Sequence, residues 1–239
     1  MIPCAEIRTL SLDVGNTLIS IDFSLISSEL QSRGLALNRA EAAGRPEFSS
    51  RMGRRSGQPD YSFRSYIQEV LSHIDLPESP GKEEIGSLAA DLTATLQADG
   101  QANRIWRWVL PGVPEALELE SFRTLGIHLI ALSNSDGTAE LSLKEAGLRD
   151  YFSTVIDFAI VGYEKPDPRI FEHALSESGA RKESTLHVGD LYHTDVEGAG
   201  NAGLHGLLLD PFGDWELEDC ESLPDLSALA AVLQEARDG

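Results

Sequence analysis

Short apolar runs alternate with amphipathic segments from about residue 110 to the end of the chain. A nearly continuous apolar run at residues 127–134 predicts a strand that is covered on both faces, and residues 185–189 and 204–210 predict two further strands. Residues 7–13 predict an earlier strand that leads into a turn, and residues 154–161 (TVIDFAIV) predict another. Each run falls short of the roughly 20 apolar residues that span a bilayer, so no membrane segment is expected.

Helical periodicity fills the intervals between these runs. It predicts helices over residues 113–125, 138–146, 167–178, 194–202 and 226–236. Asp167 followed by Pro168 is a helix start, and Gly126, Gly147 and Gly179 suit the position just after a helix. Strands that alternate with helices of this length predict an α/β fold with a parallel, doubly wound sheet.

Residues 20–108 follow a different pattern. They show no strand pattern, and their apolar residues fall into three sets that each occupy one helical face: Phe23, Ile26 and Leu30; Phe63, Ile67, Val70, Leu71 and Ile74; and Ile85, Leu88, Leu92 and Leu96. We therefore predict a Rossmann-like core formed by residues 1–19 and 109–239 and an inserted, all-helical domain at 20–108. Five arginines lie close together in the sequence of this insertion: Arg45, Arg51, Arg54, Arg55 and Arg64. They either form a solvated helix face or attract an anionic substrate.

Charge is divided unevenly between these two parts. Residues 19–110 carry 10 Lys and Arg against 12 Asp and Glu, whereas the rest of the chain carries 9 against 27. This acidic excess argues against nucleic acid and anionic membrane as partners. Cys4 and Cys220 are too few for a disulfide framework or a zinc site. Since no signal peptide is evident either, we expect a cytoplasmic protein.

Polar residues with catalytic potential follow four of the predicted strands. In chain order they are Asp13; Ser133 and Asn134; Lys165; and Gly189, Asp190 and Asp195. A parallel sheet brings the ends of its strands to one edge, where such sheets bind ligands. Three carboxylates would then lie close together, and their mutual repulsion calls for a cation. Carboxylate and carbonyl oxygens favour Mg²⁺ over zinc or copper.

This order of motifs resembles the haloacid dehalogenase (HAD)-like hydrolase superfamily. The resemblance covers nearly all of residues 7–236 and rests on SLDVGNTL (11–18), ALSNSDG (131–137), EKPDPRIF (164–171) and HVGDLYHTDVEGA (187–199). It implies a Rossmann-like core with a helical cap inserted after the first motif. It also implies a Mg²⁺-dependent hydrolase, here a phosphatase that acts on a small phosphorylated molecule.

The resemblance assigns catalytic roles to three residues. Asp13 is expected to be the nucleophile that takes up the phosphoryl group as an aspartyl-phosphate. Ser133 would bind the transferring group, and Lys165 would balance its charge. The substrate-binding residues implied in this way are Asn16, Thr17, Ser133, Asn134 and Lys165.

The resemblance also implies a metal site. Asp190 would bind Mg²⁺ beside Asp13, with the backbone carbonyl of Gly15 as a further ligand. Asp195 would support either Lys165 or the metal shell. These assignments agree with the chemistry, because phosphoryl transfer depends mainly on positioning and on neutralising charge.

The chain departs from the phosphatase pattern at Gly15. Phosphatases of the superfamily usually carry a second Asp there, which protonates the leaving group. General acid–base catalysis contributes roughly 10²–10⁴-fold to the rate, so its loss should lower turnover. The enzyme could act on good leaving groups, borrow an acid such as Asp22 or His193, or have changed its chemistry.

Other functions stay open at this stage. The main alternative is a phosphate-binding protein of this superfamily with little or no catalysis. A dehalogenase is disfavoured because the metal-site pattern around Asp190 is retained. A phosphonatase needs a lysine in its cap, and the one lysine of the insertion, Lys82, lies in a sequence typical of a loop. The sequence predicts neither the identity of the substrate nor the oligomeric state.

Overall fold

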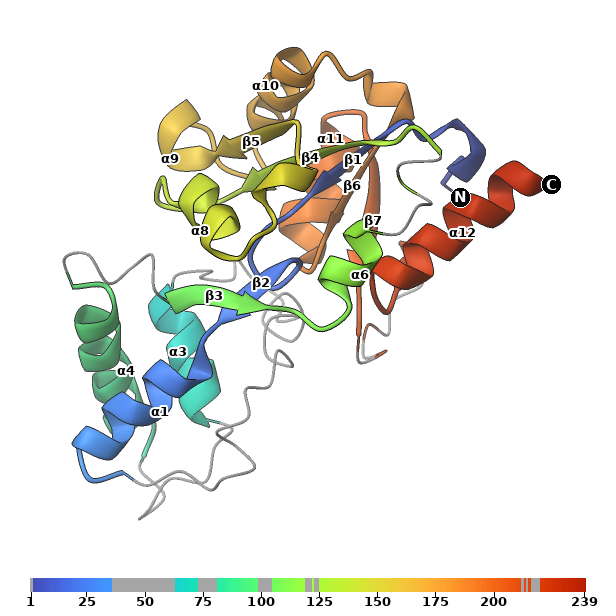
Figure 1. Ribbon diagram of the computed structural model, residues 1–239. Coiled ribbons are helices and arrows are strands. Elements are labelled where there is room, and N and C mark those ends of the chain that lie inside the picture. Colours follow the sequence, from blue (N-terminus) through green and yellow to red (C-terminus); the bar gives the residue numbers. More distant parts are fainter. Residues whose placement is uncertain are drawn as a thin grey trace. The chain divides into compact units, whose positions relative to one another are not determined.

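The computed structural model describes residues 2–35, 63–72, 81–98, 105–118, 122, 125–211, 213, 215 and 220–239. The chain divides into two compact units (Figure 1), Met1–Ile19 with Val109–Gly239, and Ser20–Trp108. Several residues singled out from the sequence lie outside the described ranges: Arg45, Arg51, Arg54, Arg55 and Ile74.

A six-stranded parallel sheet forms the centre of the first unit. Its strands are β1 (Thr9–Leu12), β4 (His128–Ser133), β5 (Thr154–Asp157), β6 (Thr185–Gly189), β7 (His205–Leu209) and β8 (Ser222–Leu223). They are arranged in the order β5-β4-β1-β6-β7-β8. The strands β4 and β5 therefore lie on one side of β1, and β6, β7 and β8 lie on its other side. This order confirms the predicted doubly wound α/β fold, and the order reverses beside β1.

Helices follow the strands of this sheet. They are α6 (Val113–Glu118), α8 (Ala139–Glu145), α9 (Phe158–Val161), α10 (Pro168–Ser178), α11 (Gly198–Asn201) and α12 (Leu226–Asp238). Single helical turns occur at Cys4–Glu6, Arg149–Tyr151 and Lys182–Ser184. A hydrophobic cluster joins β4 and β5 to α10 and α11 through Ile130, Leu132, Ile156, Ile170, Phe171, Ala174, Ala199 and Leu204. Helices α10 and α11 therefore cover one face of the sheet.

Local signals explain where several of these elements begin and end. The carboxylate of Asp167 accepts a hydrogen bond from the Arg169 amide at 3.0 Å, and Gly179 adopts a left-handed conformation after the last residue of α10. The predicted strand at 154–161 is wrong in its second half. Asp157 caps a new helix by accepting from the Ala159 amide at 3.0 Å, so the apolar run is divided into β5 and α9.

Two other predicted helices differ from the structure. The one over residues 194–202 consists of a π-helical turn, η5 (Tyr192–Glu197), followed by α11. The one over 113–125 is helical at Val113–Glu118, and only part of residues 119–125 is described.

The second unit has an apolar interior built on three described helices, α1 (Phe23–Ser32), α3 (Phe63–Ser72) and α4 (Lys82–Leu96). The interior contains most of the predicted helix-face residues together with others: Ile21, Phe23, Ile26, Leu30, Ile67, Val70, Leu71, Ala89, Leu92, Leu96 and Ile105. Three further predicted residues, Phe63, Ile85 and Leu88, are partly buried and pack against it. The prediction of an all-helical insertion without strands is wrong at its two ends, because β2 (Ile19–Ile21) and β3 (Trp106–Val109) form a two-stranded sheet. Lys82 is exposed and begins α4 rather than lying in a loop.

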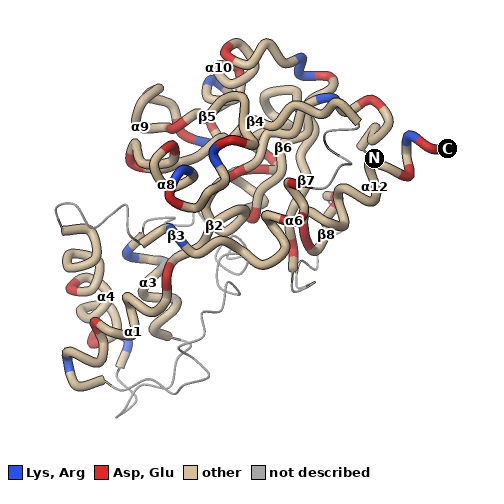
Figure 2. Tube along the Cα trace, viewed as in Figure 1, with Lys and Arg blue, Asp and Glu red and all other residues tan. Residues whose placement is uncertain are grey.

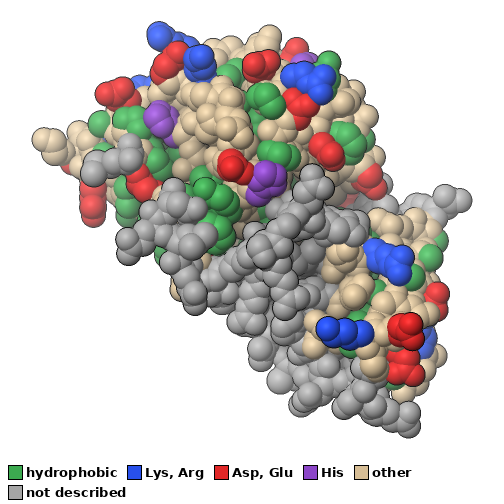
Figure 3. Space-filling view, turned by 180° about the vertical axis from the view of Figure 1, so that it is seen from behind, with side chains coloured by type: hydrophobic (Ala, Val, Ile, Leu, Met, Phe, Trp, Pro, Cys, Tyr) green, Lys and Arg blue, Asp and Glu red, His purple; other side chains and the backbone are tan. Residues whose placement is uncertain are grey.

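Charged residues are spread over the described elements. Asp and Glu are distributed over the described parts of both units (Figure 2). The face seen in Figure 3 carries hydrophobic, acidic and basic side chains next to one another. Among the described residues, no helix is both long and apolar enough to cross a membrane.

Candidate active site

Asp13 lies at the carboxyl end of β1, where the strand order reverses. Leu12 is in register with Ala131 of β4 and with Val188 of β6, and the Asp13 amide donates to the Val188 carbonyl at 2.9 Å. The carboxyl ends of these three strands therefore meet at one edge of the sheet. Doubly wound sheets bind their ligands at this position.

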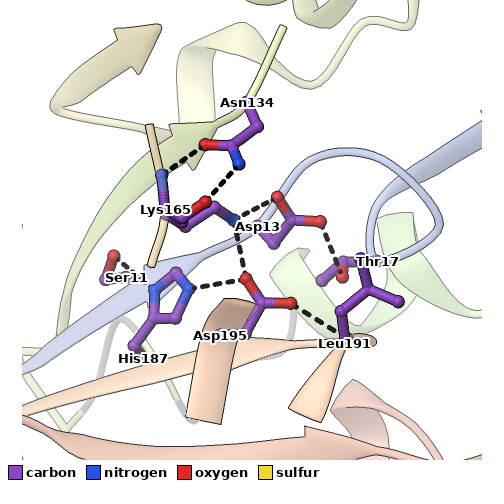
Figure 4. A network of polar contacts seen from close by, with 8 residues as sticks. All are labelled: Ser11, Asp13, Thr17, Asn134, Lys165, His187, Leu191 and Asp195. Atoms are coloured by element: carbon purple, nitrogen blue, oxygen red, sulfur yellow. Dashed lines mark hydrogen bonds and ion pairs between the residues drawn. The ribbon is translucent and has the colours of Figure 1, made fainter. Parts of the chain in front are cut away.

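Lys165 bridges two buried carboxylates at this edge (Figure 4). Its ammonium nitrogen lies 2.6 Å from Asp13 Oδ1 and 2.7 Å from Asp195 Oδ1, and the residue is 3% exposed. Burial alone would lower the pKa of Lys165, but the two carboxylates outweigh burial and raise the pKa. The lysine is therefore held as a fixed positive charge between two negative ones.

Asp13 and its loop form a compact turn. Burial raises the pKa of the Asp13 carboxyl, and the Lys165 ammonium opposes that rise. Thr17 Oγ1 donates to Asp13 Oδ2 at 3.3 Å. Asn16 adopts a left-handed backbone with φ of +54°, a conformation that Asn tolerates better than most residues, and its amide donates to the Ile19 carbonyl at 2.6 Å. Asn16 thus shapes the turn that carries Asp13 and Thr17.

Asn134 fixes the main chain of Lys165. Asn134 Nδ2 donates to the Lys165 carbonyl, and Asn134 Oδ1 accepts from the Lys165 amide, both at 2.8 Å. The amide predicted to bind substrate is therefore engaged in placing the lysine. Ser133 ends β4 and is buried, and its hydroxyl makes no hydrogen bond with any part of the chain that the structure describes. Of the two residues, Ser133 is the better placed to bind a substrate.

Three carboxylates meet beside this lysine. Asp13, Asp190 and Asp195 are all buried, and each offers an oxygen within 4.8 Å of the others. One lysine cannot neutralise three buried carboxylates, and oxygen donors of this kind suit a hard cation such as Mg²⁺. The residues present therefore fit the predicted metal.

Asp195 is engaged mainly with the protein. Its Oδ1 accepts from Lys165 and lies 3.2 Å from His187 Nε2, while its Oδ2 accepts from the Leu191 amide at 3.0 Å. Burial alone would raise the pKa of Asp195, but Lys165 and His187 together outweigh burial and lower the pKa. Of the two roles expected for Asp195, support of Lys165 is the one these contacts favour.

Glycines allow this close packing. A Cβ atom on Gly189 would lie 2.3 Å from Asp195 Cγ, and one on Gly198 would lie 2.9 Å from Pro166 Cβ. Any side chain at Gly189 would therefore displace Asp195. A side chain at Gly198 would press on the residue that follows Lys165.

Asp157 is a buried site-forming residue that the sequence interpretation missed. It accepts hydrogen bonds from the amides of Gly137, Ala139 and Ala159, each at 3.0 Å, and from the hydroxyl of Ser135. These bonds tie the loop after Ser133 to the end of β5. An acidic residue directly after the apolar strand residues Val155 and Ile156 is the signal that could have identified this cap.

The two residues considered as substitute acids have other partners. Asp22 caps α1 through the Ser24 amide at 3.0 Å and binds Arg107 Nε at 2.7 Å. Burial acts to raise the pKa of Asp22, but the hydrogen bonds from Ser24 and Arg107 lower it, which makes it a poor proton donor. His193 is exposed and pairs with Glu197. These contacts do not support Asp22 or His193 as the acid that protonates the leaving group.

The fold and this site together define an α/β protein of the Rossmann-like class, with an acidic, metal-compatible centre where the strand order reverses. The chain belongs to the haloacid dehalogenase-like hydrolase family, whose family model matches residues 7–203. This membership confirms the superfamily expected from the sequence motifs.

Several known proteins resemble all or part of the chain. It is 27% identical to haloacid dehalogenase-like hydrolase domain-containing protein 3 of Bos taurus, over 95% of this chain and 94% of that protein. A phosphoserine phosphatase of Thermus thermophilus is 38% identical over 48% of this chain and 47% of its own length. The structure of magnesium-bound YfnB from Bacillus subtilis matches with a TM-score of 0.62 at 16% identity, over 95% of this chain and 98% of that one. The last match supports the fold.

Proposed function

We propose that this chain is a Mg²⁺-dependent phosphatase that hydrolyses a small phosphomonoester through an aspartyl-phosphate on Asp13. One observation carries the proposal: the buried Lys165 ammonium contacts the carboxylate of Asp13 at the ligand-binding edge of the sheet. A phosphoryl group brings negative charge to this edge, and catalysis of its transfer consists mainly of positioning and charge neutralisation.

In the proposed reaction, an oxygen of Asp13 attacks phosphorus and forms an O–P bond as the bond to the leaving oxygen breaks. Water then hydrolyses the acyl phosphate, which restores the carboxylate and releases phosphate. A carboxylate nucleophile divides one difficult hydrolysis into two easier steps. Ser133 would hold a phosphoryl oxygen at the end of β4.

Lys165 would place its remaining N–H toward the phosphoryl group. An ammonium has three donors, and Asp13 and Asp195 engage two of them. The positions of these two carboxylates therefore set the direction of the third donor. Thr17, which donates to Asp13, would hold the nucleophile in place.

The residues proposed to hold Mg²⁺ are Asp13, Asp190 and the backbone carbonyl of Gly15, with Asp195 adjacent. A Mg²⁺ ion bound there supplies charge neutralisation for phosphoryl oxygens. We also propose that residues 20–108 act as a cap domain on a core of residues 1–19 and 109–239.

Several relatives support phosphatase chemistry by their names. Besides the phosphoserine phosphatase, a glyceraldehyde 3-phosphate phosphatase of Methanothermobacter thermautotrophicus is 39% identical over 38% of this chain and 41% of its own length. These names belong to those proteins. They favour a small phosphorylated substrate here without selecting one.

A second candidate rests on Gly15. With no carboxylate at that position, the chain could bind phosphate with little or no turnover. A screen of many phosphomonoesters with Mg²⁺ and with EDTA separates the two candidates. Metal-dependent hydrolysis supports the phosphatase, and phosphate binding without turnover supports the alternative. Chloride release from 2-chloropropionate would instead indicate a dehalogenase.

A further inference from the structure

A buried histidine lies behind Lys165 and has no part in the reaction proposed above. His187 on β6 is fully buried, and its ring meets that of Phe171 edge to face, with the two centroids 5.1 Å apart. Its Nε2 lies 3.2 Å from Asp195 Oδ1, and its Nδ1 lies 2.9 Å from the hydroxyl of Ser11. Ser11 and His187 are register partners on β1 and β6, so the sheet itself places these two side chains together.

The chemistry of the partners determines where the imidazole carries its hydrogen. A carboxylate that already binds Lys165 can only accept, so Nε2 must donate to Asp195. In the neutral ring, Nδ1 is then an acceptor, which the Ser11 hydroxyl satisfies. Burial lowers the pKa of His187, which agrees with a neutral ring. The Asp195 carboxylate thus fixes the tautomer, and the Ser11 hydroxyl matches it by donating to Nδ1.

We propose that His187 is a positioning residue that orients Lys165 through Asp195, and that the Ser11 hydroxyl holds the ring in place by donating to Nδ1. The chain of contacts runs from Ser11 through His187, Asp195 and Lys165 to Asp13 (Figure 4). The inference rests on the proposed function, in which Lys165 contacts the phosphoryl group.

The consequence of losing this contact follows from the geometry. Asp195 Oδ1 has two donors, Lys165 and His187. Removing the His187 donor frees the carboxylate to turn toward the lysine, and Lys165 then changes its direction relative to Asp13. A displacement of about 1 Å in a positioned group costs on the order of 10²-fold in rate.

Two substitutions of His187 separate positioning from packing. In H187Q the side-chain amide nitrogen lies near the place of Nε2 and keeps a donor to Asp195. In H187N the amide lies near Nδ1 and reaches Ser11 but not Asp195. Both variants are polar and smaller than histidine, so a purely structural role predicts similar losses. T185V is a matched control, because Thr185 is a buried residue of the same strand and the substitution removes its part-buried hydrogen bond from Oγ1 to the Arg181 carbonyl at 2.8 Å.

With para-nitrophenyl phosphate and Mg²⁺, we expect kcat of H187N to fall by roughly 10–100-fold with KM nearly unchanged. H187Q should recover kcat to within about threefold of the wild type, and T185V should lower the melting temperature without lowering kcat. Equal kcat losses in H187N and H187Q, or a loss in neither, would overturn the proposal.

A spectroscopic measurement tests the same inference without turnover. The chain has four lysines, Lys82, Lys144, Lys165 and Lys182, so ¹⁵N-labelled lysine gives few ammonium signals, and a Lys165 variant identifies the one of interest. The Lys165 signal should shift in H187N and return toward the wild-type position in H187Q. If the wild type hydrolyses no phosphate ester, the proposed function fails, and an unshifted signal in H187N would separately refute the positioning role.

Discussion

Asp13 and Asp190 follow neighbouring parallel strands, β1 and β6, and offer carboxylate oxygens within 4.8 Å of each other. Both residues are buried. Two carboxylates held so close to each other repel, and a divalent cation bound between them would relieve that repulsion. This relationship leads to the first prediction.

The substitution D190A should weaken Mg²⁺ binding by at least about tenfold, or 1.4 kcal/mol, because it removes one of the proposed ligands. Isothermal titration calorimetry measures the affinity. D150A removes an exposed carboxylate in the turn before β5, at the amino end of that parallel strand, and serves as the charge-matched control. Equal Mg²⁺ affinities in D190A and the wild type would refute the assignment of Asp190.

The substitution K165M should destabilise the protein by about 3–5 kcal/mol, because it leaves Asp13 and Asp195 buried without their cation. Chemical denaturation measures this loss. Since a bound Mg²⁺ neutralises the same carboxylates, added Mg²⁺ should raise the melting temperature of K165M more than that of the wild type. An equal rise in both proteins would show that the lysine and the metal do not share these carboxylates.

Much of the core could be predicted from the sequence because its signals are local. Helix α10 has its cap, its proline and its terminal glycine within the segment, and β4 contains a continuous apolar run, LIAL. The two-stranded sheet of β2 and β3 could not be predicted. Three residues are too few to show a period, and the partner strand lies more than 80 residues away.

The site was predictable in its residues but not in its internal contacts. Asp13, Lys165 and Asp190 stand out because each follows a predicted strand. The engagement of Asn134 with the main chain of Lys165 depends on how two loops meet, which no local pattern encodes. His187 looks in the sequence like an ordinary strand residue, and its role follows only from the register of β1 and β6.

The substitution G189A should lower kcat by on the order of 10²-fold, because its Cβ would lie 2.3 Å from Asp195 Cγ and displace that carboxylate. G200A is the matched control. Gly200 lies in α11, and a Cβ added there would have no neighbouring atom within 4 Å, so alanine should stabilise the helix by about 0.5–1 kcal/mol and leave kcat unchanged. Steady-state kinetics of both variants test this prediction. Full activity in G189A would contradict the role of Asp195 in placing Lys165.

The substitution G15D should raise turnover of alkyl phosphates by roughly tenfold or more relative to aryl phosphates, because it supplies a proton donor for a poor leaving group. Without a residue to supply that proton, the wild type should favour aryl or acyl phosphates. Gly15 does not adopt a positive φ, so an aspartate there meets no penalty from a left-handed backbone. The measurement is the ratio of kcat/KM for an alkyl phosphate to that for para-nitrophenyl phosphate.

Two controls accompany G15D. A thermal melt and a Mg²⁺ titration show whether the variant is folded and binds metal. If it does both and the alkyl-to-aryl ratio is unchanged, another residue already protonates the leaving group in the wild type. The preference for good leaving groups would then be wrong.

The central claim is that Asp13 carries the phosphoryl group. Turnover of para-nitrophenyl phosphate is quenched, the trapped acyl phosphate is reduced with borohydride, and the peptides are sequenced by mass spectrometry. Reduction of an aspartyl-phosphate gives homoserine, which we expect at position 13 in the wild type and not in D13N, which should be folded but inactive. Turnover in the wild type without homoserine at position 13, or D13N retaining more than about a tenth of the wild-type rate, would contradict the account.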